Sequence, residues 1–401
     1  MGFSSSEYAG KPEFDLNPKD NEESTSKSSA AYDSLSKYIT FPTLGQCDWW
    51  RKAGPTLGKL LRDAKYDLCQ QFQYLYLFGM HIIPMLGPFP TDRPGLYRSV
   101  LGGLGSLEFS QNFTQSQRTV RIAFEPTSHA ASTGEDPCNR RMVNEALSRL
   151  KSLSPQMDLQ LYYQLITELT LTDEEERILS NRNELETQPG KTQSILALDL
   201  KGGDIAVKLY LYPGLKSAAT GAPILQIVFN SVRKVDHKGA FSDSLALIED
   251  FLRTAPPSIS VHFLSCDLVA LRNMRFKIYI AEFQVDFKRI TDIWTLGGKL
   301  QDQETLTGLR MLRELWEALK IPEGKRSQVE RPTMPGDPPH LLPLLFNFEI
   351  QPHKPLPQLK VYFPLTGIND MTIATSLTQL FSRWEWSEPA QCYSRDLASY
   401  R

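Results

Sequence analysis

The chain has 401 residues, of which 41% are hydrophobic and 22% are charged, and its net charge is −2. This length and composition predict a folded protein with one large domain or two medium ones. Lysine and arginine together number 44 against 46 acidic residues. The lack of a basic excess argues against a nucleic-acid or membrane-surface partner.

Neither a membrane span nor a secretory signal is expected. No apolar run reaches the length of about 18 residues that a spanning helix needs, and the N-terminus lacks a cationic and an apolar region. The five cysteines are odd in number and widely spaced, which favours reduced thiols over a disulfide framework or a zinc site. We therefore expect a cytoplasmic protein.

Residues 1–37 are rich in serine and charged residues and are expected to form a disordered tail. A single folded domain is then expected over 38–401. Apolar residues at helical spacing predict a helix over 49–85, which the prolines of PMLGPFP end.

Four pairs of short alternating segments predict four β-hairpins. Their strands are 106–113 and 118–126, 194–200 and 205–213, 258–268 and 274–283, and 344–350 and 358–364. Helices are predicted over 141–152, 157–168, 172–185, 242–254, 287–295, 303–319 and 369–383. Strands joined so closely pair antiparallel. The pattern predicts an α+β fold in which helices cover one face of an antiparallel sheet that can curl into a β-barrel around a lumen.

A lysine and a tyrosine two residues later recur in the second strand of three hairpins. These triplets are Lys208 to Tyr210, Lys277 to Tyr279, and Lys360 to Tyr362. Strand side chains alternate between faces, so each lysine shares a face with its tyrosine. One such pair is typical of a solvated sheet face. Three at matching positions indicate a shared lumen.

Arg121, Arg275 and Tyr212 lie on the same predicted face as these triplets. Five cations in one lumen suit a multiply charged anion such as pyrophosphate. Tyrosine ring faces attract a cation without reacting with it as a base does. The combination suits an allylic pyrophosphate, whose leaving group must be held and whose carbocation must be kept from water.

Two further residues are candidates for binding an acceptor molecule. Glu108 lies one strand before Arg121, and its carboxylate can accept a proton or a hydrogen bond from an N–H group. His262, in SVHFLSC, can face the same lumen. A lone strand glutamate is more often on the solvated surface, and a lone strand histidine is more often packed or solvated.

Several segments together resemble the fungal indole prenyltransferases of the dimethylallyltryptophan synthase family, from about Tyr38 to the C-terminus. The matching segments are MHIIPMLGPFP, LEFSQNF, VRIAFEP, VKLYLYPGLKS, FLSCDLV, RFKIYI, IWTLGGKL and LKVYFP. Within the family, the chain resembles members that prenylate tryptophan-containing cyclic dipeptides. Members that use free tryptophan carry a lysine where SILALDL has none, which also favours a cyclic dipeptide.

The resemblance implies an αββα barrel of ten strands and metal-independent use of dimethylallyl diphosphate as a substrate, without a cofactor. It implies diphosphate binding by Arg121, Lys208, Arg275, Lys277 and Lys360, the last at a place where some members have glutamine. It implies cation shielding by Tyr210, Tyr212, Tyr279 and Tyr362, indole N–H binding by Glu108, and acceptor binding by His262. The acidic run 173–176 reads as a helix start and is not the DDxxD metal motif. The reaction implied is Friedel–Crafts alkylation of the indole.

The partners expected are therefore small molecules only, on a monomer or a homodimer. Only four of the family's five hairpins can be found before Arg401. An incomplete barrel would leave two unpaired edges and admit water to the lumen. A truncated or non-catalytic relative that binds prenyl diphosphate is thus one alternative. A prenyltransferase for free tryptophan, an indole diterpene or a tyrosine derivative is another.

Overall fold

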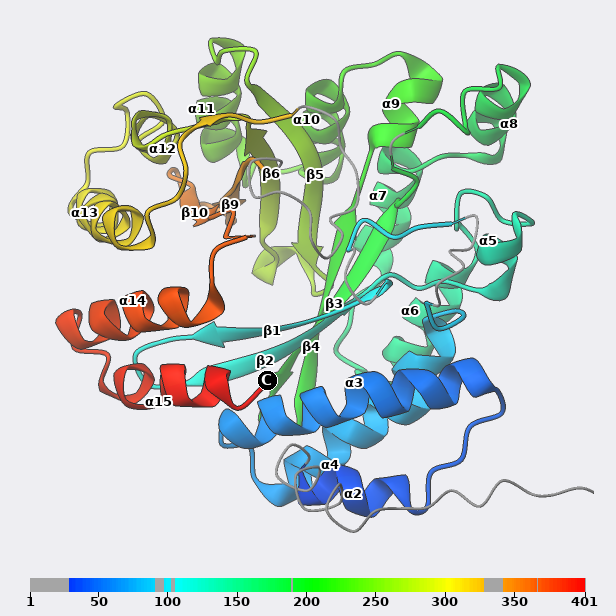
Figure 1. The fold of residues 1–401 in the computed structure, drawn as a ribbon. Coiled ribbons are helices and arrows are strands. Elements are labelled where there is room, and N and C mark those ends of the chain that lie inside the picture. The colour runs from blue at the N-terminus through cyan, green and yellow to red at the C-terminus, as the bar shows by residue number, and fades with distance from the viewer. Residues whose placement is uncertain are drawn as a thin grey trace, which may run out of the picture.

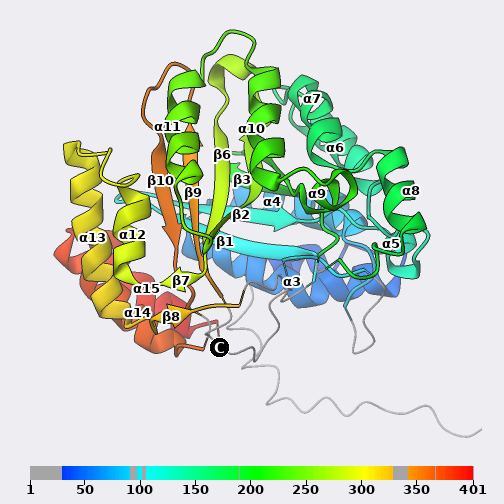
Figure 2. The ribbon, with the colours of Figure 1, turned by 90° about the horizontal axis from the view of Figure 1, so that it is seen from above.

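A computed structural model describes residues 29–90, 97–101, 105–188, 190–327, 342–365 and 367–400. Its centre is one antiparallel sheet of eight strands that curls into a half-barrel, with helices along its outer side (Figures 1 and 2). The strand order follows the chain: β1 (Leu107–Phe113), β2 (Arg118–Phe124), β3 (Ser194–Lys201), β4 (Asp204–Leu211), β5 (Ile259–Asp267), β6 (Phe276–Glu282), β9 (Leu344–Ile350) and β10 (Gln358–Tyr362). A small second sheet pairs β7 (Gln284–Val285) with β8 (Gly324–Lys325).

The helices in the described residues precede, separate and follow the hairpins. They are α2 (Ala30–Ser36), α3 (Leu44–Asp63), α4 (Leu68–Leu77), α5 (His129–Thr133), α6 (Met142–Leu153), α7 (Gln160–Leu169), α8 (Asp173–Asn181), α9 (Gly214–Thr220), α10 (Ile224–Val235), α11 (Ser242–Arg253), α12 (Phe287–Trp294), α13 (Gln303–Leu319), α14 (Asp370–Arg383) and α15 (Ser387–Ala398). None of the helices in this described part of the chain is long and apolar enough to cross a membrane.

The core lies between the helices and the outer face of the sheet. Alternate strand residues such as Ile122, Leu198, Leu209, Ile278 and Phe348 are fully buried there. Helix α10 packs on β5, and α11 packs on β9. The period of two that buries these residues turns the residues between them toward the concave inner face.

The four predicted hairpins and the antiparallel sheet are confirmed, but the single helix predicted over 49–85 is wrong. Helix α3 ends at Asp63, and Lys65 adopts a left-handed backbone conformation with φ of +62°. Asp67 then starts α4 by accepting the backbone N–H of Gln70 at 2.8 Å. A π-turn and a 3₁₀ turn finish the segment at Met85, where the prolines follow.

Helix α2 lies inside the stretch that was expected to be a disordered tail. Ser29 caps it, Ala31 is fully buried, and the ring of Tyr32 stacks on that of Trp50 at 5.0 Å. Burial against α3 therefore orders residues 30–36, whose composition alone predicts disorder. Residues 1–28 lie outside the described residues.

Helices α14 and α15 fold back onto β1 and β2, which Figure 1 shows in red beside cyan. Arg118 of β2 bonds Asp396 at 2.8 Å and Glu388 at 3.0 Å. The ring of Tyr393 packs on Phe113 at 5.4 Å, away from the tyrosines of the inner face. Strands β1 and β10 are the two ends of the eight-stranded order.

Candidate active site

The register of the sheet places the predicted cations on its concave face. Arg121 pairs with Asp199, Lys208 with Asp267, Lys277 with Glu349, and Lys360 with Asn347. Directly paired residues point to the same face, and this face continues from strand to strand. Arg275 is two residues before Lys277 and shares its side.

Three carboxylates connect four of these cations. Arg121 Nε lies 2.6 Å from Asp199 Oδ1, and Lys208 bonds the other oxygen of Asp199. Arg275 Nε lies 2.7 Å from Asp267 Oδ2. Lys277 Nζ lies 2.9 Å from Glu349 Oε2, and Arg275 reaches Oε1 of the same group at 3.3 Å.

The fifth cation, Lys360, has no ion pair within the residues that the structure describes. Lys360 is exposed on β10, and partial desolvation together with the nearby Lys277 and Arg121 lowers its pKa. Five cations face three paired carboxylates and the single carboxyl group of Glu108, so positive charge remains in excess on this face. The concave face is therefore suited to an anion that adds its own charge to the network.

Ion pairing also fixes the protonation of Asp199. This carboxylate is 8% exposed, and its bonds to Arg121 and Lys208 hold its pKa at about 2 against the opposing effect of burial. It stays ionised at neutral pH and keeps both cations in place.

An aromatic row begins where the cation network ends. The ring of Tyr279 lies 6.0 Å from Tyr210, 6.2 Å from Tyr362 and 4.1 Å from Phe263. Tyr212 stacks on the other side of Phe263 at 4.5 Å. The row thus joins aromatic residues of β4, β5, β6 and β10 beside the cations.

The hydroxyls of Tyr210, Tyr279 and Tyr362 remain protonated because burial raises the pKa of each of them. Burial raises the pKa of Tyr210 to about 12, and Asn347 Nδ2 lies 3.0 Å from the Tyr362 hydroxyl. These side chains present neutral ring faces, which attract a positive charge and do not act as bases.

Glu108 pairs with Ala123 on β2 and so shares the face of Arg121. Glu108 is exposed on this face, yet partial desolvation by the neighbouring strands raises its pKa, and the charge of Arg121 opposes the shift. Glu108 in turn contributes to the raised pKa of Tyr362, whose main cause is burial. Glu108 and Tyr362 lie on the two end strands, so the curl of the sheet brings their side chains within electrostatic reach of each other.

His262 reaches the same side through an irregularity of β5. The register shifts between Val261 and Phe263, so that Val261 enters the core while Phe263 joins the aromatic row. His262 Nε2 bonds Ser260 Oγ at 2.8 Å, and its ring lies 6.1 Å from that of Phe283. This position lies beyond Tyr279 along the strands, away from the cations.

Sequence reasoning missed four residues of this site: Asp199, Asp267, Glu349 and Phe263. The signal that reveals them is cross-strand register. In SILALDL, Asp199 lies on the strand that pairs with Lys208, and in LLFNFEI, Glu349 lies opposite Lys277. No three histidine, cysteine or acidic side chains of the described residues gather in a way that would hold a metal ion.

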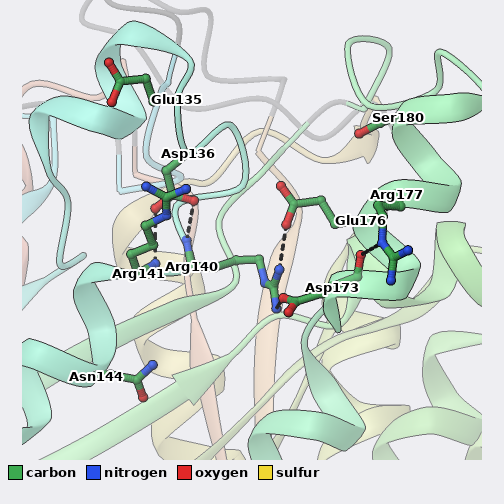
Figure 3. Close-up of a pocket in the computed structure, with 9 residues that line it drawn as sticks. All are labelled: Glu135, Asp136, Arg140, Arg141, Asn144, Asp173, Glu176, Arg177 and Ser180. Atoms are coloured by element: carbon green, nitrogen blue, oxygen red, sulfur yellow. Dashed lines mark hydrogen bonds and ion pairs between the residues drawn. The ribbon is translucent and has the colours of Figure 1, made fainter.

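A separate polar hollow of about 610 Å³ lies outside the sheet, next to α8 (Figure 3). Arg140 lies in it, 2.8 Å from Asp173 and 2.6 Å from Glu176. Thr172 caps α8 at this point, which agrees with the prediction that the run 173–176 starts a helix. The cluster uses its acids for ion pairs with Arg140.

Comparisons with known proteins agree on one family. The sequence model of the family described as Tryptophan dimethylallyltransferase matches residues 46–396. The chain is 43% identical over 376 residues to the roquefortine prenyltransferase roqD of Penicillium rubens, which covers 94% of this chain and 88% of the relative. It is 38% identical to a tryptophan dimethylallyltransferase of Arthroderma otae, with 93% of this chain and 84% of the relative covered.

A solved structure has the same fold. It is that of NotF in complex with brevianamide F and DMSPP, with a TM-score of 0.80, 32% identity, and coverage of 93% of this chain and 90% of that one. The half-barrel of this chain thus corresponds to a known prenyltransferase fold.

Proposed function

The chain belongs to the tryptophan dimethylallyltransferase family of prenyltransferases, and we propose that it prenylates the indole of a tryptophan-containing cyclic dipeptide. The donor in this proposal is dimethylallyl diphosphate. The observation that carries it is the single concave face on which a cation network adjoins an aromatic row.

The cation network would bind and release the diphosphate. When the allylic C–O bond breaks, its electron pair leaves with the diphosphate, and the negative charge on that group grows. Lys277, Arg275 and Arg121 lie on the same concave face and would stabilise this negative charge. Lys360 adds a positive charge that forms no ion pair with a carboxylate of the described residues. These fixed cations supply the role that Mg²⁺ has in other diphosphate chemistry, so the reaction is proposed to be metal-independent.

The aromatic row would hold the dimethylallyl cation. Tyr210, Tyr279 and Tyr362 offer neutral ring faces from three strands, and Tyr212 extends the row through Phe263. The indole carbon then forms the new C–C bond, and the ring carbon loses its proton. Glu108, whose pKa is raised by desolvation, would accept a hydrogen bond from the indole N–H and increase the electron density of the ring.

The cyclic-dipeptide acceptor is supported by what β3 contains. Between Ser194 and Leu200 its inner face presents Ile195, Ala197 and Asp199 and no lysine, and Lys201 follows only at the exposed end of the strand. Asp199 is already paired with Arg121 and Lys208. His262 lies past the aromatic row, where an acceptor would extend away from the diphosphate. Free tryptophan and other aromatic acceptors are the alternatives that the experiment must separate.

One observation favours a second candidate function, which is binding of prenyl diphosphate without turnover. Strands β1 and β10 end the described sheet, so the edges of its inner face do not pair with each other. Water that reaches this face would quench a carbocation and weaken the ionic contacts.

Product analysis by mass spectrometry separates these functions. The chain is incubated with dimethylallyl diphosphate, excess EDTA, and tryptophan or one of several tryptophan-containing cyclic dipeptides. We expect a product heavier by one dimethylallyl unit, formed fastest from a cyclic dipeptide. A faster reaction with free tryptophan would refute the acceptor class, and loss of product on adding EDTA would refute metal independence. Donor binding without any product would favour the second candidate.

A further inference from the structure

A second cationic cavity lies where the chain leaves β6, beyond the end of the aromatic row. It has a volume of about 670 Å³. Its lining comes from three segments: the approach to β5, the stretch from β6 into α12, and β8. The lining residues are Pro256, Pro257, Ser258, Phe283, Gln284, Arg289, Lys325 and Arg326. Three of them are cationic and none is acidic.

Arg289 is held in place from behind the cavity. Its Nε donates to Glu282 Oε2 at 2.7 Å, and its Nη1 donates to Asp292 Oδ2 at 2.9 Å. Glu282 is fully buried and also accepts the backbone N–H of Gln284 at 2.7 Å. The Nη2 group of Arg289 is buried and has no hydrogen-bond partner. One end of the guanidinium is therefore fixed, and one donor is left unused.

Arg326 is more deeply buried, with 7% of its surface exposed. Its backbone N–H donates to Phe283 O at 2.7 Å, and its Nη2 donates to Pro322 O. Its Nε is buried without a partner. Within the described ranges it makes no ion pair, and burial lowers its pKa. A buried cation without a counter-charge is strongly unfavourable unless an anion offsets it.

We propose that this cavity binds a small oxyanion, either a carboxylate or a phosphate group. Arg326 Nε and Arg289 Nη2 would donate to it, and the exposed Lys325 would add a third charge at the entrance. Guanidinium groups match carboxylate and phosphate oxygens in geometry, and buried donors without partners call for such a ligand.

The cavity is distinct from the diphosphate cations. Lys277 and Phe283 are six residues apart along β6 and its continuation, or about 20 Å at the rise of an extended strand. Phe283 lines the cavity and also lies beside the ring of His262. The anion would therefore bind at the far end from the diphosphate, next to the place proposed for the acceptor.

Isothermal titration calorimetry with inorganic phosphate, at constant ionic strength in chloride buffer, tests the site. The proteins compared are wild type, R326Q, K325Q, K277Q and K288Q. Lys288 is on α12 and does not line the cavity, so K288Q is the matched control. We expect R326Q and K325Q to weaken one phosphate-binding event about tenfold or more, and K277Q and K288Q to keep it.

Activity assays distinguish a free phosphate from an acceptor carboxylate. If the carboxylate of an acceptor uses the cavity, K325Q raises KM for tryptophan several-fold and leaves KM for a cyclic dipeptide unchanged. If a free phosphate is the ligand, calorimetry changes and neither KM does. Phosphate binding that K325Q leaves intact, together with unchanged KM values, overturns the proposal. K325Q alters an exposed side chain, so the test stands even if R326Q does not fold.

Discussion

Asp199→Asn tests the cation network most directly, because this one carboxylate binds both Arg121 and Lys208. Its pKa falls from 3.8 to about 2 in the folded protein. At about 1.4 kcal/mol per pKa unit, the ionised side chain contributes about 2 kcal/mol to folding at neutral pH. The substitution should therefore lower the free energy of unfolding by about 2 kcal/mol, because two cations lose their counter-charge.

The pH dependence has a definite sign. A carboxyl group whose pKa is lowered by folding stabilises the protein above its unfolded pKa, and the contribution is lost as pH falls toward the folded value. The wild type should lose this contribution between about pH 4 and pH 2. The D199N variant lacks it throughout, so the stability difference between the two proteins should shrink over that window.

Pyrophosphate connects this effect to function. In D199N, Arg121 and Lys208 lack their carboxylate partner, so a bound diphosphate should raise the free energy of unfolding more than it does in wild type. Urea unfolding with and without pyrophosphate measures both effects, and D204N, at the exposed first residue of β4, is the control. The reasoning is refuted if D199N unfolds like wild type, or if pyrophosphate stabilises both proteins equally.

Three further substitutions test the rest of the site. Glu108→Gln should lower kcat about 100-fold and leave the affinity for dimethylallyl diphosphate within about twofold. Product formation measures kcat, and donor titration measures the affinity. A large loss of donor affinity would contradict the acceptor role of Glu108. Lys360→Met should weaken donor binding about tenfold with little loss of stability, because no described carboxylate pairs with it; unchanged donor affinity would exclude it from the diphosphate site. Tyr279→Leu should raise the share of donor that ends as dimethylallyl alcohol, since the ring covers the proposed cation beside Phe263; an unchanged ratio of alcohol to prenylated product would argue against shielding.

The hairpins and the inner-face lysines and tyrosines were predictable because one simple pattern determines both. In RFKIYI, apolar Phe276, Ile278 and Ile280 alternate with the cations and Tyr279, so period two places Lys277 and Tyr279 together on the face opposite the apolar residues. The acids were harder to predict. Strand β3 is buried on both faces up to its last residue, so alternation carries no information there, and Asp199 looks like one polar residue in an apolar run.

The break in the predicted helix shows a different limit. No glycine or proline lies where helix α3 ends after Asp63. Lys65 adopts a left-handed backbone conformation there, which a lysine in the sequence does not predict. The readable signal is Asp67 with Gln70 three residues later, a capping box that starts a new helix. A periodic apolar pattern predicts which face is buried, and the caps inside it predict how many helices share that face.

The acceptor end of the site depends on a bulge that alternation alone would hide. In a regular strand, Val261 and Phe263 would share one face, and His262 would take the other. The register shift lets Val261 enter the core while Phe263 stacks on Tyr279, and His262 bonds Ser260 on the inner side. One extra residue thus adds a polar group beyond the aromatic row, and the bulge keeps the ring of Phe263 in that row. Deleting His262 should restore regular pairing, with Phe263 still opposite Tyr279, and remove only the polar group. It should therefore impair acceptor binding more than pyrophosphate binding, which depends on cations further along the sheet.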